Sequence, residues 1–325
     1  MVMRFVPGQK LFLAAVVVFG ASLLGFLALF YDQGMASSAK PGDNPIDADR
    51  AMGYLEDLCK IGPRQSGSAG MGAQQKLLRK HFEQLGAKVE MQRFDARHPL
   101  NGSRVQMANL LVHWHPEKQR RILFCAHYDT RPYPDQDRVN PRGTFVGAND
   151  GASGTALLME LAHHMPDLAG KYGVDFALFD AEEFVFSDRD KYFLGSEHFA
   201  REYLGGKVRY QAAVLVDMIG DAQLAIPKDR SSISWKDTRP VVNEIWHTAR
   251  RLRVREFVNV VNNGILDDHI PLHNLGGIPC CDLIDFDYPH WHTQADTPDK
   301  CSGESLAKVG WVLHEWLSRL QRQRE

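Results

Sequence analysis

Acidic and histidine side chains follow four of the strands that the sequence predicts. They are His127 and Asp129 after residues 122–126, Glu182 and Glu183 after 174–179, Asp217 after 212–216, and His290 and His292 after 279–286. In an open α/β sheet the ligand crevice lies beyond the carboxyl ends of the strands, so we expect these residues to converge. Imidazole and carboxylate groups are common zinc ligands, and the pattern therefore indicates a metal site.

Three residues would complete the protein shell of a catalytic zinc ion. Asp150 lies in the glycine-rich turn GANDGASG, at the start of a predicted helix. A catalytic zinc ion takes three protein ligands and keeps one position open, and Asp150, Glu183 and His292 would fill the three. The neighbouring Glu182 is then free to move protons, and Trp291 offers an aromatic wall beside the metal.

Each of these residues has an ordinary structural explanation when it is taken alone. An aspartate at the start of a helix, such as Asp150, is commonly an N-cap. A glutamate pair after a strand is commonly solvated, and a histidine in a loop, such as His292, is commonly a hydrogen-bonded surface residue. Their combination at strand ends in one chain is what favours a metal site.

The elements that must position these residues form an α/β pattern. Runs that are apolar throughout, such as 174–179, are typical of strands buried on both faces. We therefore predict a central, largely parallel mixed sheet flanked by helices on both faces. The predicted strands are 88–94, 105–114, 122–126, 174–179, 212–216 and 279–286, and the predicted helices are 47–59, 69–85, 152–164, 195–203, 241–252 and 305–320.

The N-terminal region predicts a membrane anchor. Residues 11–30 are an uncharged apolar run, long enough at about 1.5 Å per residue to cross a hydrocarbon core of about 30 Å. The basic residues that precede the run place residues 1–10 in the cytoplasm. We predict a transmembrane signal anchor at 11–30, a linker at 31–44 and a catalytic domain at 45–325, which is periplasmic, extracellular or in a secretory lumen. Cleavage at the small residues 37–39 would make the domain a secreted protein.

Charge and cysteine content exclude other classes of protein. The formal net charge is -2, and no basic run interleaves with aromatic residues, so we expect no nucleic-acid partner. The five cysteines have no CxxC spacing, so neither a disulfide framework nor a thiolate zinc site is indicated.

The ordered motifs of the chain resemble the zinc aminopeptidase-like metallopeptidases, family M28, which also contain the animal-type glutaminyl cyclases. The motifs are HYD at 127–129, GANDGASG at 147–154, DAEE at 180–183, VDMIGD at 216–221, LDDH at 266–269 and WHT at 291–293. The resemblance covers nearly the whole chain from about Cys59 to the C-terminal helix. It implies a zinc exopeptidase-like fold and a peptide or protein N-terminus as substrate.

Two features are more similar to the cyclases than to the aminopeptidases. The sequence DDHIP at 267–271 stands where the peptidases usually have Ser-Asp-His. The segment 184–194 separates Glu183 from Gly195, as an inserted loop does in the cyclases. A disulfide of the animal enzymes has no counterpart, because Cys125 is displaced and the loop around Asp150 has no cysteine.

The resemblance to cyclases implies one zinc ion and the cyclisation of N-terminal glutamine to pyroglutamate, with release of ammonia. Glu182 would transfer the proton, and Asp217 and Asp267 would form a hydrogen-bonded carboxylate pair that supports it. Trp291 would wall the substrate pocket. His127 would lie behind the metal ligands, oriented by Asp129, or would hold a second metal.

Two alternatives use the same residues differently. In a two-zinc aminopeptidase, His127, Asp150 and Asp217 would bind the second metal, and Glu182 would activate a water molecule for peptide hydrolysis. In an inactive, membrane-anchored binding ectodomain, the site would have no chemical role. That last alternative is disfavoured because every chemical position is filled.

Overall fold

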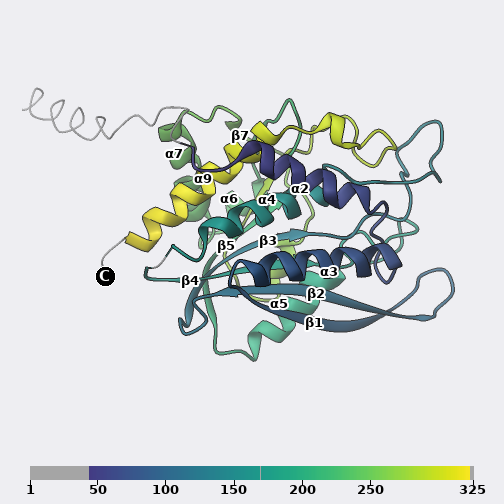
Figure 1. Ribbon diagram of the computed structural model, residues 1–325, viewed down its shortest axis with the longest axis horizontal. Helices are drawn as coiled ribbons and strands as arrows, with labels where there is room; N and C mark the ends of the chain where they lie inside the picture. Colours follow the sequence, from purple (N-terminus) through teal and green to yellow (C-terminus); the bar gives the residue numbers. More distant parts are fainter. Residues whose placement is uncertain (1–43, 169, 323–325) are drawn as a thin grey trace, which may run out of the picture. The chain divides into compact units, whose positions relative to one another are not determined.

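The computed structural model describes residues 44–168 and 170–322 (Figure 1). The predicted membrane span at 11–30 and the linker residues before Asn44 lie outside this range. Within it, no helix is both long enough and apolar enough to span a bilayer. The predicted anchor therefore stays a prediction from the sequence.

A six-stranded mixed sheet lies at the centre of the domain, in the order β1-β2-β4-β3-β5-β8. Strands β4, β3, β5 and β8 are parallel, whereas β2 is antiparallel to β4 and β1 is antiparallel to β2. The predicted largely parallel mixed sheet is thus confirmed. The strands are β1 (Lys88–Arg97), β2 (Arg104–Trp114), β3 (Arg120–His127), β4 (Gly173–Phe179), β5 (Arg209–Asp217) and β8 (Cys280–Ile284).

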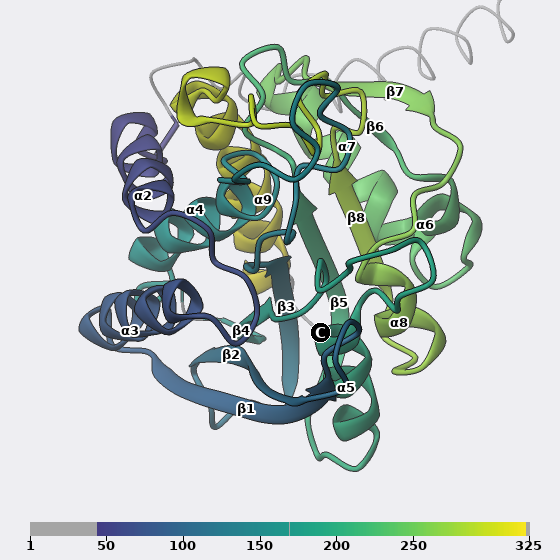
Figure 2. The same cartoon turned by 90° about the vertical axis from the view of Figure 1, so that its right-hand side faces the viewer.

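Helices cover both faces of the sheet, as Figure 2 shows. Helices α3, α4 and α9 lie on one face, where α2 packs outside them on α4 and α9, and α5 and α8 lie on the other. Helix α7 packs against α9 and β8. Their bounds are α2 (Ala48–Lys60), α3 (Ala69–Gln84), α4 (Ala152–Leu161), α5 (Leu194–Leu204), α7 (Arg239–Leu252), α8 (His269–Asn274) and α9 (Gly303–Arg322).

The alternation of side chains along β3 explains why both faces are covered. The ring of Phe124 contacts Phe176 of β4 and Trp316 of α9 edge-on, at centroid distances of 5.9 and 6.0 Å. The next residue, Cys125, packs on the opposite face in a cluster with Phe199 of α5. A strand that is apolar on both sides must be covered on both sides, and this buries the parallel strands that lead to the site.

Several short elements of the described residues are absent from the predicted set. Strands β6 (Ile226–Lys228) and β7 (Phe257–Val261) pair in parallel as a separate two-stranded sheet. Helix α6 (Arg230–Ser234) and α8 span only five and six residues. Elements this short do not complete two helical turns or a clear alternation, so sequence periodicity does not reveal them.

Candidate metal centre and active site

The structure places all of the predicted site residues at the carboxyl end of the parallel strands. His127 is the last residue of β3 and Asp217 is the last residue of β5. The other residues lie in adjoining loops: Glu182 and Glu183 after β4, Trp291 and His292 after β8, Asp129 after β3, Asp150 before α4, and Asp267 before α8. Residues that are far apart in the sequence are thereby brought into one site.

Asp150, Glu183 and His292 form a buried group with the geometry of zinc ligands. Nε2 of His292 lies 3.4 Å from Oδ2 of Asp150 and 3.3 Å from Oε1 of Glu183. Donors placed about 2.0–2.1 Å from a tetrahedral zinc ion are about 3.3–3.4 Å apart, so the spacing fits this metal. Within the described residues, Nε2 of His292 and Oδ2 of Asp150 are buried without a hydrogen-bond partner. A bound cation would satisfy these atoms.

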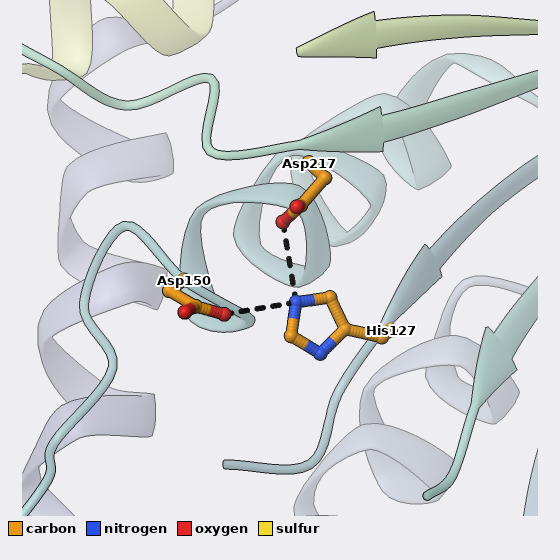
Figure 3. Close-up of side chains that lie close together, drawn as sticks. All are labelled: His127, Asp150 and Asp217. Atoms are coloured by element: carbon orange, nitrogen blue, oxygen red, sulfur yellow. Dashed lines mark hydrogen bonds and ion pairs between the residues drawn. The ribbon is translucent and has the colours of Figure 1, made fainter. Parts of the chain in front are cut away.

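A second group shares Asp150 with the first (Figure 3). Nε2 of His127 lies 3.2 Å from Oδ1 of Asp150 and 3.2 Å from Oδ1 of Asp217. Asp150 therefore turns one carboxylate oxygen toward His127 and the other toward His292. The two adjoining groups accommodate either one metal ion or two.

Arg131 and Asp135 support the first group, and sequence reasoning did not identify either. Oδ1 of Asp135 lies 3.0 Å from Nδ1 of His292, which orients the imidazole and directs its Nε2 toward the ligand group. Arg131 donates to Oε2 of Glu183 at 2.7 Å and to Asp135 at 2.9 Å. Because Arg131 occupies one oxygen of Glu183, the other oxygen faces His292. Both residues lie in the loop after the HYD motif, in a stretch without a pattern of its own.

Asp129 contacts the acidic pair more closely than it contacts His127. Its carboxylate accepts hydrogen bonds from the backbone N–H groups of Glu182 and Glu183, at 3.2 and 3.1 Å. Oδ1 of Asp129 lies 3.7 Å from Nδ1 of His127, which is longer than a hydrogen bond. Asp129 thus fixes the backbone that carries both glutamates, and its predicted role in orienting the imidazole of His127 stays a prediction.

Buried carboxyl groups surround the open side of the site. Burial and then the charge of Glu183 raise the pKa of Glu182 well above its usual value. Burial and then the charge of Asp217 likewise raise the pKa of Asp267 well above its usual value. Asp267 accepts a hydrogen bond from the backbone N–H of Asp268 at 2.5 Å. Among the described residues no hydrogen bond joins Asp217 to Asp267, although the charge of Asp217 acts on Asp267, so the hydrogen-bonded pair stays a prediction.

The backbone is held in unusual conformations beside these side chains. His292 has a φ of 54°, Ala181 before Glu182 has 60°, and Met218 after Asp217 has 46°. Residues other than glycine rarely adopt such angles, and the cost is accepted most often at functional sites. Gly151 has a φ of 94°, and a Cβ atom there would lie 2.7 Å from the carbonyl oxygen of Asp129. Only glycine therefore lets the Asp150 turn approach the end of β3.

A cavity of about 360 Å³ opens over the site. The Trp291 ring lines it and stacks on His292, with centroids 3.8 Å apart and planes at 27°. Phe286 contacts Trp291 at a centroid distance of 5.0 Å. Cavities of this size accept small ligands or single side chains.

Comparisons with known proteins agree with the motifs. The model of "Peptidase family M28" matches residues 109–317. The crystal structure of Fimbriiglobus ruber glutaminyl cyclase is 43% identical with a TM-score of 0.81, covering 86% of this chain and 99% of that one. A leucine aminopeptidase precursor from Bacteroides thetaiotaomicron is 27% identical with a TM-score of 0.79, covering 86% and 98%.

A curated relative supports the same assignment. The glutaminyl-peptide cyclotransferase of Bos taurus is 26% identical over 286 residues, which are 77% of this chain and 76% of the relative. The family predicted from the motifs is confirmed. The chain therefore belongs to peptidase family M28 and, within it, to the group that includes the glutaminyl cyclases.

Proposed function

We propose that the protein is a zinc-dependent glutaminyl-peptide cyclotransferase, which converts N-terminal glutamine of peptides to pyroglutamate and releases ammonia. The observation that carries the proposal is one small cavity in which a zinc-ligand group adjoins buried carboxyl groups of raised pKa. Similarity to cyclases over 86% of the chain supports it. The sequence predicts the same activity.

The protein residues contribute binding, orientation and proton transfer. Asp150, Glu183 and His292 would hold a zinc ion, which would supply Lewis-acid polarisation of the side-chain carbonyl group of the substrate. The cavity would hold the glutamine side chain folded back beside Trp291, so that the α-amine meets the side-chain carbonyl carbon, Cδ, within one molecule. The bond from the α-nitrogen to the side-chain carbonyl carbon, Cδ, forms, the bond from Cδ to the side-chain amide nitrogen breaks, and no water is consumed.

Glu182 is the proton carrier in this proposal. Its carboxylate takes a proton from the attacking α-amine and returns it to the departing ammonia. Burial and the charge of Glu183 raise the pKa of Glu182, which makes it a stronger base than an exposed glutamate. Asp267 also lines the cavity, and burial and the charge of Asp217 raise its pKa, so its protonated form would donate a hydrogen bond to the substrate.

The test is an ammonia-release assay with a Gln-initiated dipeptide, using the full chain in non-ionic detergent. We expect one ammonia per peptide and a product that lacks a free α-amine. A dipeptide that begins with leucine serves as the control and should remain intact. Release of free amino acids from either peptide, without cyclisation, would contradict the proposal.

A two-zinc aminopeptidase is the second candidate, because Asp150 faces both His127 and His292. Metal analysis of the purified protein separates the candidates: the cyclase requires one zinc ion per chain and the aminopeptidase requires two. Substitution of His127 by alanine should leave the zinc content of the cyclase unchanged. Loss of one of two bound ions in that variant would favour the aminopeptidase.

The place of the enzyme in the cell follows from the N-terminal sequence alone. An apolar run at 11–30 after a basic flank anchors the catalytic domain outside the cytoplasm. Protease added to intact cells or spheroplasts should therefore degrade the domain, which should sediment with membranes. A soluble, protease-protected product would contradict the anchor and leave the catalytic proposal untouched.

A further inference from the structure

A second cleft among the described residues lies away from the catalytic cavity. Its volume is about 960 Å³, against about 360 Å³ for the cavity beside Trp291, and the two share no lining residue. The cleft is formed by α7, the strand pair β6 and β7, and the C-terminal half of α9. Neither the proposed reaction nor its metal site accounts for it.

Positive charge dominates this cleft. The basic residues that line it are Lys228, Arg250, Arg253, Arg255 and Arg319, and within the described residues none of them forms a salt bridge. The single acidic lining residue is Glu244, whose Oε2 accepts a hydrogen bond from the Trp316 indole at 3.3 Å. Because the whole chain has a formal net charge of -2, this concentration of cations is a local feature.

The positive charge of the cleft also affects the pKa of His247. His247 lines the cleft, and its pKa is lowered by burial and then by the charges of Arg250 and Arg319. The guanidinium of Arg250 also contacts Nδ1 of His247, at 2.9 Å. The neighbouring arginines, which form no salt bridge with any described residue, disfavour the protonated form of His247. A bound anion would reduce this repulsion between positive charges.

The floor of the cleft is aromatic and rigid. The rings of Trp246 and Phe257 meet edge to face at a centroid distance of 5.3 Å, and both residues are buried. Nε1 of Trp246 donates to the carbonyl oxygen of Val258 at 2.9 Å, which fixes the indole. A cationic rim over an apolar floor fits a ligand with an anionic group and an apolar part.

We propose that this cleft binds a phosphate group carried by an organic ligand, at a site separate from catalysis. Arginine favours phosphate because its planar guanidinium donates two parallel hydrogen bonds to the oxygens. Three of the lining arginines, Arg250, Arg253 and Arg255, come from one stretch and Arg319 comes from α9, so arginines of two separate segments border the same cleft. The aromatic floor would contact the apolar part of the ligand.

The test uses the full chain in non-ionic detergent and three soluble probes. They are inorganic phosphate, dihexanoyl phosphatidylglycerol, and dihexanoyl phosphatidylcholine as a control with the same tails but no net charge. Calorimetric titration should give saturable binding of phosphatidylglycerol that weakens as salt is added. Equal binding of inorganic phosphate would identify a soluble phosphate ligand, whereas preference for phosphatidylglycerol would identify a lipid headgroup. Absence of binding by both anionic probes, or equal binding of phosphatidylcholine, would overturn the proposal.

Matched variants assign the binding to the cleft. The triple variant Arg250→Gln, Arg253→Gln, Arg319→Gln should weaken the binding of the anionic probe at least tenfold. The control removes three cations from α3, through Lys76→Gln, Arg79→Gln and Lys80→Gln, and should bind as the original chain does. Both variants should keep the melting temperature and the ammonia-release rate, which shows that they fold. Unchanged binding in the first variant, or an equal loss in the second, would contradict the site.

Discussion

Two adjacent glutamates have different chemistry because their neighbours differ. Burial alone would raise the pKa of Glu183, but the charge and hydrogen bond of His292 outweigh it, and Arg131 adds to the effect, so the pKa is lowered. Burial and the charge of Glu183 raise the pKa of Glu182. A carboxylate that stays ionised suits a metal ligand, and one of raised pKa suits proton transfer.

Replacement of Glu182 by glutamine should therefore remove turnover without removing the metal. The amide is nearly isosteric but cannot take up the proton, so we expect kcat to fall by a factor of about 10²–10⁴. Ammonia release measures the rate, and metal analysis measures the zinc. Glu183→Gln is the matched control and should lose zinc together with activity. Loss of zinc from the Glu182 variant would mean that Glu182, and not Glu183, is the zinc ligand.

Asp135 should control zinc affinity through His292. Substitution by asparagine weakens the interaction at Nδ1 of His292, now 3.0 Å long, and leaves the ring less well oriented. We expect zinc affinity to fall about 10–100-fold, measured by competition with a coloured chelator. The exposed Asp57 of α2 offers the control Asp57→Asn, which should leave affinity unchanged. Equal zinc affinity in the Asp135 variant would show that this contact is dispensable.

A buried acid near the site should make stability depend on pH. Burial and then the charge of Asp129 raise the pKa of Asp180 to about 7, from an unfolded value of about 3.8. Between these values the folded state binds more protons than the unfolded state, so this residue's contribution to stability falls as pH rises from 4 to 7. Asp180→Asn should remove that loss, because asparagine never ionises while Ser66 and the N–H of Ala108 keep a polar partner.

Urea unfolding at pH 5 and pH 8 measures this effect. The variant should gain free energy of unfolding relative to the original chain at pH 8, and should gain little or none at pH 5. A difference between the two proteins that is the same at both pH values would show that Asp180 does not titrate in this window.

The sequence displays the proposed metal ligands but not the residues that support them. Glu183 and His292 lie in motifs that follow strands, whose carboxyl ends meet at one edge of the sheet, and Asp150 lies in the glycine-rich turn before α4. Arg131 and Asp135 follow the HYD motif in a loop whose path is set by contacts with Glu183 and His292. Their importance arises only from tertiary contacts, which no local spacing records.

At the scale of the elements, a buried ion pair joins β3 to β4 at the end away from the site. Arg121 donates to Oδ1 and Oδ2 of Asp175 at 2.6 and 2.7 Å, and each side chain is only 2% exposed. Arg121 also donates to the carbonyl oxygens of Trp114 and His115, at 2.7 and 2.8 Å. One guanidinium therefore links the starts of two parallel strands to the end of β2.

Arg121→Met should destabilise the fold strongly, because it leaves Asp175 and the carbonyl groups buried without their donor. We expect a loss of about 3–5 kcal/mol in the free energy of unfolding, measured with urea by tryptophan fluorescence. The matched control is Arg79→Met, which breaks an exposed pair with Glu83 and should have a far smaller effect. Similar losses of unfolding free energy in both variants would show that the buried ion pair stabilises the fold no more than the exposed pair does.

The hydrophobic pattern of the sequence predicts the order of the long helices and strands, but it does not predict the two-stranded sheet of β6 and β7. Strand 174–179 was predicted from its apolar run and is observed as β4, one residue longer. The predicted helix 152–164 ends as an α-helix at Leu161 and continues as a 3-10 turn to His164. Strands β6 and β7 pair across about thirty residues, so their pairing depends on packing that a short window does not contain.

At the scale of the whole molecule, charge is distributed very unevenly. The catalytic cavity gathers acids such as Glu182, Asp217 and Asp267, while the cleft at α7 and α9 gathers cations. The net charge of -2 conceals both regions. Glu182 and Asp217 were predictable because they follow strands, and Asp267 was predicted from the family resemblance. The arginines at 250–255 lie close together in the sequence, but Lys228 and Arg319 join them only in the folded chain.

The metal centre joins distant parts of the fold, so metal removal should destabilise the whole domain. Asp150 precedes α4, Glu183 follows β4 and His292 follows β8, and a zinc ion would tie these three loops together. A ligand bound only by the folded state stabilises it by about 4 kcal/mol at a thousandfold excess over its dissociation constant. For a domain of this size the corresponding drop in melting temperature on chelation is roughly 10 °C.

Differential scanning fluorimetry with and without a chelator measures this drop, and added zinc should reverse it. His292→Ala gives the decisive comparison, because that variant should melt at the lower temperature and should no longer respond to chelator or zinc. His127→Ala should keep the full response if a single ion is held by Asp150, Glu183 and His292. A response that is halved in the His127 variant would place a second ion between His127 and Asp217, and would thereby support the aminopeptidase arrangement against the cyclase.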